Sequence, residues 1–101
     1  MPQGPIPVAN VPAGSSSAEY TTNVSSQAKL GWGALTGIVV NAAGTGSTIT
    51  LYDGTSASDK KLMVLATATL GVVNMPPVRF VTGLFVVTAG SAAADVTVLY
   101  T

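Results

Sequence analysis

Apolar and polar residues alternate along several short stretches of the chain, most clearly over residues 47–52. Ile49 and Leu51 alternate with Thr48, Thr50 and Tyr52, which are expected to point outward. This period of two is typical of a half-buried strand. Residues 95–101 alternate in the same way, with Val96, Val98 and Tyr100 on one face and Thr97, Leu99 and Thr101 on the other. We expect Ile49 and Leu51 to point into a core.

Two further stretches, residues 61–67 and 83–88, are apolar on both faces. An antiparallel strand with one solvated face should alternate, so these strands are expected to be central in a sheet or to meet another chain. Shorter strands are expected at residues 19–24, 29–32, 34–41 and 78–81. Met75-Pro76-Pro77 is expected to interrupt the sheet before residue 78, because proline donates no ladder hydrogen bond.

The chain is rich in valine and threonine and has 11 glycines, which favours strands joined by turns. Alanine clusters such as residues 92–94 lack a helical apolar stripe. The sequence therefore predicts an all-β fold, an antiparallel β-sandwich or jelly roll of about seven or eight short strands.

Residues 1–28 differ from the rest, because prolines and small residues dominate their first half. Dense proline disfavours helix and sheet and favours an extended path, so we expect an N-terminal arm over 1–28 and a β-sandwich domain over 29–101. The arm is expected to contact neighbouring subunits through Pro5, Ile6, Val8 and Val11. The alternative is that it lies along its own domain.

Charged residues make up only 8% of the chain, against about 25% in ordinary globular domains. Four acidic and four basic residues cancel, and a surface with so little net charge tends to associate. We expect much of this surface to face other subunits. The alternative is a small soluble domain hydrated by its serine and threonine hydroxyls.

Histidine and cysteine are absent, so the usual acid, base, nucleophilic and thiolate metal chemistry is missing. A hydroxyl nucleophile activated by Lys60 or Lys61 would need a buried lysine, which the sequence context does not indicate. We predict a protein that is not an enzyme and that takes no cofactor or metal.

Two local patterns resemble binding loops. Residues 31–37 contain three glycines, but their spacing misses the dinucleotide fingerprint and no helix is expected after them. We expect Trp32 to fill the core or an interface, while the glycines admit a neighbouring backbone or a bulge. Asp53 and Asp59 flank a hydroxyl-rich loop that lacks the further acids of a calcium loop, and a hairpin turn is the expected structure.

The chain has no basic run that would bind nucleic acid and no apolar run of about 18 residues that would span a bilayer. Its first residues lack the basic and apolar regions of an export signal. We therefore expect no nucleic-acid or membrane partner and no export.

Several segments from Gly33 onward resemble small virion proteins of tailed bacteriophages: residues 37–41, 48–57, 82–86 and 94–100. The resemblance implies a head decoration or cement protein, a small β-domain that is often trimeric and clamps the junctions between major capsid subunits. It implies a location on the capsid exterior, with assembly in the bacterial cytoplasm. Its partners would be further copies of itself and the major capsid protein.

Within that function, four aromatic residues are the expected core or subunit contacts: Trp32, Phe80, Phe85 and Tyr100. The alternative function is a tail-tip or head-fibre module that binds a host receptor or glycan through sandwich loops. That function needs exposed aromatic platforms, for which Tyr20, Tyr52 and Tyr100 are the candidates.

Overall fold

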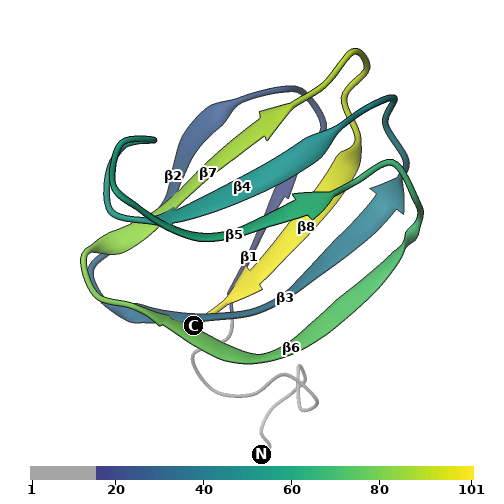
Figure 1. Ribbon diagram of the computed structural model, residues 1–101. Helices are drawn as coiled ribbons and strands as arrows, with labels where there is room; N and C mark the ends of the chain where they lie inside the picture. Colours follow the sequence, from purple (N-terminus) through teal and green to yellow (C-terminus); the bar gives the residue numbers. More distant parts are fainter. Residues whose placement is uncertain (1–15) are drawn as a thin grey trace, which may run out of the picture.

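The computed structural model describes residues 16–101, which form eight antiparallel strands in two four-stranded sheets (Figure 1). The predicted all-β sandwich is confirmed. The strands are β1 (Ser16–Tyr20), β2 (Ser25–Leu30), β3 (Gly33–Ala42), β4 (Thr48–Asp53), β5 (Lys60–Ala66), β6 (Gly71–Phe80), β7 (Gly83–Ala89) and β8 (Asp95–Tyr100).

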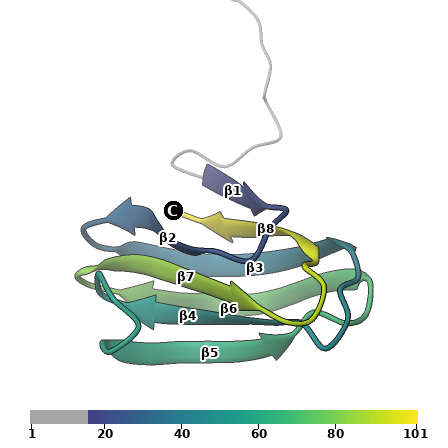
Figure 2. The same cartoon turned by 90° about the horizontal axis from the view of Figure 1, so that it is seen from above.

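The strand pairs are nested around the β4–β5 hairpin. Outward from that hairpin, β3 pairs with β6, β2 with β7, and β1 with β8. The pairs β3·β8 and β4·β7 then join these into the sheets β1-β8-β3-β6 and β2-β7-β4-β5. This is the strand order of an eight-stranded jelly roll. The edge strands β1 and β5 lie on opposite sides of the molecule (Figure 2).

The core lies between the sheets and is made almost entirely of aliphatic side chains. Ile49 and Leu51 are fully buried, as their alternation predicts, and so are Val96 and Val98 on the facing sheet. Because successive strand residues point to opposite faces, each central strand contributes two or three side chains to this layer. The buried hydrophobic residues are Leu35, Ile38, Val40, Ile49, Leu51, Phe80, Leu84, Val86, Ala94, Val96 and Val98.

The sandwich begins earlier than the sequence pattern suggested. Ser16 pairs with Tyr100 at the start of β1, and Tyr20 at its end packs against the core. Residues 16–28, which the sequence assigned to the arm, thus belong to the sandwich, as β1, a short connection and the start of β2. Proline is confined to positions before residue 13 in this half of the chain, so nothing prevents these residues from pairing.

The expected break at Met75-Pro76-Pro77 is wrong, because β6 runs through it. Leu35 pairs with Val78 and Gly37 with Asn74, so the three residues from Met75 to Pro77 bulge opposite Thr36. β6 is an edge strand, and proline is tolerated at edges and bulges because no ladder donor is required there.

The two strands that are apolar on both faces have different surroundings. β7 lies between β2 and β4, and is central as expected. β5 is instead an edge strand, and its outward Val64 is 53% exposed. Because β5 is not central, the other expectation for it, a contact with another chain, stays a prediction.

Two polar contacts connect parts of the sandwich. On the β1–β2 side, the Tyr100 hydroxyl donates a 3.2 Å hydrogen bond to the carbonyl of Ala28, so β8 of one sheet is joined to β2 of the other. At the opposite end from Tyr100, the buried Thr67 hydroxyl donates to the Ser47 hydroxyl at 2.7 Å, and the Thr67 N–H donates to the Ser47 carbonyl. These contacts satisfy polar groups that would otherwise be buried without partners.

Candidate interaction surface

Two turns meet at one end of the sandwich and expose apolar side chains there. The β2–β3 turn contains Gly31, whose φ of 89° lies in the left-handed region that glycine adopts without strain. The Gly31 N–H donates a 2.8 Å hydrogen bond to the carbonyl of Thr82 in the β6–β7 turn. The exposed apolar residues of the two turns are Leu30, Trp32 and Val81, with 70%, 72% and 65% of their surface accessible.

The β6–β7 turn is held by the Asp53 carboxylate at the end of β4. This carboxylate accepts hydrogen bonds from the N–H groups of Val81 at 3.0 Å and of Thr82 at 2.8 Å. Burial raises the pKa of Asp53, but the hydrogen bonds from Thr82, Val81 and Gly83 outweigh it, so the pKa lies below its ordinary value. Val81 is thus presented to solvent by a fixed turn.

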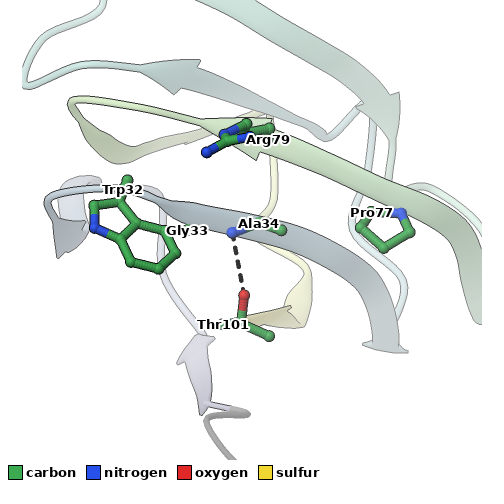
Figure 3. Close-up of a pocket in the computed structure, with 6 residues that line it drawn as sticks. All are labelled: Trp32, Gly33, Ala34, Pro77, Arg79 and Thr101. Atoms are coloured by element: carbon green, nitrogen blue, oxygen red, sulfur yellow. Dashed lines mark hydrogen bonds between the residues drawn. The ribbon is translucent and has the colours of Figure 1, made fainter.

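A groove of about 290 Å³ opens beside these turns, on the outer face of the β1-β8-β3-β6 sheet (Figure 3). Its lining comes from the start of β3, the end of β6 and the residue after β8. Trp32 and Pro77 lie on opposite sides of it, with Ala34 between them (Figure 3). The lining residues are Trp32, Gly33, Ala34, Pro77, Arg79 and Thr101.

The groove combines an aromatic face with positive charge. Arg79 lies directly opposite Ala34 in the β3–β6 register, so both point to the outer face. The Lys29 ammonium lies 5.9 Å from the centre of the Trp32 ring and donates a 3.0 Å hydrogen bond to the Thr101 carbonyl. No acidic residue lines the groove. The surface therefore suits a ligand that offers apolar groups together with hydrogen-bond acceptors such as carbonyl oxygens.

Gly33 makes the groove floor possible. A Cβ atom at this position would overlap the Thr101 carbonyl and lie 2.8 Å from Cζ of the Phe80 ring. The absence of a side chain lets β3 start between the core and the end of β8. The expectation that a glycine of residues 31–37 admits a neighbouring backbone is confirmed, and a strand rather than a helix follows, so the resemblance to a phosphate loop ends there.

The four aromatic residues expected at core or subunit contacts have different positions. Phe80 is fully buried. Phe85 and Tyr100 are half-buried; Phe85 lies 6.5 Å from the Tyr52 ring, and Tyr100 packs against the core. Trp32 does not lie in the core, because it belongs to the turn between β2 and β3, which exposes its ring. For Trp32, a contact with another molecule remains the prediction.

The other predicted positions fall into two groups. The arm residues Pro5, Ile6, Val8 and Val11 lie outside the described part of the chain. The loop from Asp53 to Asp59 is a turn: Asp59 accepts hydrogen bonds from the N–H groups of Thr55 and Ser56, while Asp53 serves the β6–β7 turn.

Within residues 16–101, no three acidic, histidine or cysteine side chains gather where they would hold a metal ion. Lys60 and Lys61 are exposed at the start of β5. In the same range, no helix has the length and apolar character that crossing a membrane requires.

Further exposed apolar residues lie on or next to the edge strands β5 and β6, which belong to different sheets. Val64 points outward from β5, Leu70 precedes β6, and Val72 points outward from it. They are 53%, 62% and 59% accessible. None of these three residues lines the groove, so they provide a matched comparison for the Trp32 end.

Sequence reasoning did not find the groove, because three distant segments form it. Pro77, Arg79 and Thr101 carry no local pattern that relates them to Trp32. The one available signal was the glycine before Ala34, which indicates a close approach without naming the partner.

Comparisons with protein-family models, with curated proteins and with solved structures give no match.

Proposed function

We propose that this protein is a virion structural protein of a tailed bacteriophage, a capsid decoration or cement protein that binds between major capsid subunits and stabilises the head. The observation that carries the proposal is the exposure of Leu30, Trp32 and Val81 on fixed turns of a domain with almost no charge. Exposed apolar groups at one end of a domain favour contact with a protein partner over contact with water.

The fold supports this function without deciding it. Jelly rolls with this strand order occur in viral capsid proteins and also in lectins and other classes, so the site must carry the argument. In this function the protein sits on the capsid exterior as a homo-oligomer, expected to be a trimer, after assembly in the bacterial cytoplasm. Many copies, each with a modest apolar contact, hold the shell by avidity.

The arm would add a second contact to each copy. Pro5, Ile6, Val8 and Val11 supply apolar side chains on a segment that lacks charge. A contact made by both the domain and the arm is stronger than either alone, because the second binds at the effective concentration set by the first.

Receptor or glycan binding at a tail tip or head fibre is the second candidate. The tyrosines proposed for it, Tyr20, Tyr52 and Tyr100, are half-buried, and Tyr20 and Tyr100 pack against the core. The exposed aromatic ring is that of Trp32, beside Arg79, and this pairing also suits stacking on a sugar.

Microscopy of intact particles that contain the protein separates the two functions. Density over junctions between major capsid subunits supports decoration, whereas density confined to the tail or to protruding fibres contradicts it and supports adhesion.

A binding assay with undecorated capsids tests the surface. The variant Leu30→Ser/Trp32→Ala/Val81→Ser is expected to lose capsid binding. The matched control Val64→Ser/Val72→Ser removes exposed apolar groups elsewhere and is expected to keep it. Equal binding by both variants would contradict the assignment of the Trp32 end.

A further inference from the structure

We propose that the groove lined by Trp32, Pro77 and Arg79 binds residues 5–8 of a second copy of this chain, so that each subunit inserts its own segment into a neighbour. This inference rests on the proposed function, since it names the partner that the groove holds within a shell of identical subunits. The occupant is Pro5-Ile6-Pro7-Val8.

The groove has the chemistry that proline-rich segments require. Extended proline-rich chains bind grooves lined by aromatic rings, because the ring face packs on the pyrrolidine and little conformational entropy is lost. Trp32 supplies such a ring, with 72% of its surface uncovered, and Pro77 faces it across the groove. A proline ring seated between them would cover apolar surface on both sides.

The charges of the groove match the backbone of such a segment. A polyproline-type chain has no internal hydrogen bonds, so its carbonyl oxygens are available as acceptors. The Arg79 guanidinium at the groove carries five N–H donors and has no acidic residue beside it in the lining. Residues 1–15 contain no charged side chain, so nothing in them is repelled by Arg79 or Lys29.

Ser16, the first residue that the structure describes, lies at the end of the sheet that carries the groove. Ser16 pairs with Tyr100, and the residue after β8, Thr101, lines the groove. From β1 to β3 there are two strand spacings, which is about 10 Å.

Distance favours a neighbour over the segment's own domain. Residues 5–8 precede Ser16 by 8 to 11 positions, which an extended polyproline-type chain spans in roughly 25 to 34 Å. That is roughly 2.5 to 3.5 times the distance to the groove of the same chain. Proline at positions 5, 7 and 12 opposes the reversal that would bring residues 5–8 back.

The test uses the fluorescence of Trp32, which is the only tryptophan in the chain. The acceptor is the full chain with Ile6→Lys/Val8→Lys, which keeps the groove but gives the segment charges that Arg79 and Lys29 repel. The donor is the full chain with Trp32→Ala, which keeps the segment and does not emit. Mixing the two is expected to move the acceptor emission to shorter wavelength by several nanometres, since the ring becomes covered, and the shift should saturate with donor concentration.

Two controls make the result specific. A donor that carries Trp32→Ala together with Ile6→Lys/Val8→Lys is expected to give no shift. An acceptor with the same added charge outside the motif, Ala9→Lys/Ala13→Lys, is expected to show the blue-shifted emission at high concentration without any donor. Circular dichroism of each variant checks that the sandwich is intact.

An acceptor emission that stays constant over the whole donor titration would overturn the proposal. So would an equal shift with the doubly defective donor, because the covering group would then be another part of the chain. If the fluorescence shift is absent but the protein still binds capsids, the groove assignment is wrong and the decoration function stands. If the shift is saturable but no density is found on capsids, the decoration function is wrong and the groove assignment stands.

Discussion

The Asp53 carboxylate accepts a 2.8 Å hydrogen bond from the N–H of Thr82, and so joins the end of β4 to the turn between β6 and β7. Val81 donates to the same carboxylate. One side chain thereby fixes the turn that presents Val81 and that in turn receives the Gly31 N–H. The exposed Trp32 end therefore depends on a residue that has no part in the groove.

Replacing this carboxylate should destabilise the domain. Asp53→Ala is expected to lower the free energy of unfolding by about 1–3 kcal/mol at pH 7, because several backbone donors lose a charged acceptor. The lowered pKa of Asp53 means that its contribution is present above the ordinary carboxyl range and is lost as pH falls through the lowered value. Denaturant unfolding of both proteins at pH 7 and pH 2 measures this.

Asp59→Ala is the matched control, because its carboxylate is bonded only within its own exposed loop. It should cost less than Asp53→Ala. A larger loss for Asp59→Ala, or a deficit for Asp53→Ala that persists unchanged at pH 2, would contradict this account.

Glu19 should show the opposite pH dependence. A hydrogen bond shared with Asp95, and then the negative charge of Asp95, raise the pKa of Glu19. A raised pKa contributes stability below the ordinary glutamate range, and this contribution is lost as pH rises through the folded-state value. Glu19→Gln is therefore expected to raise the midpoint of thermal unfolding at pH 7 and to change it little at pH 3. A lower midpoint at pH 7 would refute the repulsion.

The buried Thr67 hydroxyl should contribute measurably to the free energy of unfolding through its hydrogen bond to Ser47. Thr67→Val keeps the shape but leaves the Ser47 hydroxyl without its 2.7 Å partner in a buried site. A loss of about 1–3 kcal/mol in the free energy of unfolding is expected. The double variant Thr67→Val/Ser47→Ala should recover part of it, since both polar groups are then gone. A double-mutant cycle in denaturant checks the coupling, and strict additivity would disprove it.

Phe80 and Trp32, the aromatic residues next to Gly33, should contribute very differently to the free energy of unfolding. Phe80→Ala is expected to cost about 3–5 kcal/mol, because it empties a fully buried position next to Gly33. Trp32→Ala should cost less than about 1 kcal/mol, because the ring is exposed. Thermal unfolding of the two variants gives the comparison, and a Trp32→Ala loss as large as that of Phe80→Ala would show that the ring is part of the core.

Local alternation predicted the part of the fold in which each strand has one buried face. Ile49, Leu51, Val96 and Val98 occupy the expected positions because a period of two fixes the face of a strand once one residue is assigned. The class of fold followed from the number of such strands and their spacing. Their order in the sheets required pairings between distant segments, which no local pattern contains.

The misplaced features share a tertiary origin. Whether Pro76 and Pro77 end a strand depends on whether β6 is at an edge. Whether Trp32 is buried depends on where the turn between β2 and β3 lies in the sandwich. The groove is of the same kind, since the residue after β8 meets the start of β3 only in the folded sheet.

The bulge at Met75-Pro76-Pro77 affects how one molecule can pair with another through its sheet edge. An unpaired edge strand can pair with the edge strand of another molecule, and repeated pairing of this kind leads to fibrils. Pro76 and Pro77 have no amide hydrogen to donate to a new strand at the middle of β6, and the register of the strand is irregular there. Pairing of two molecules through β6 is thereby disfavoured, and association at this edge is directed to side chains instead.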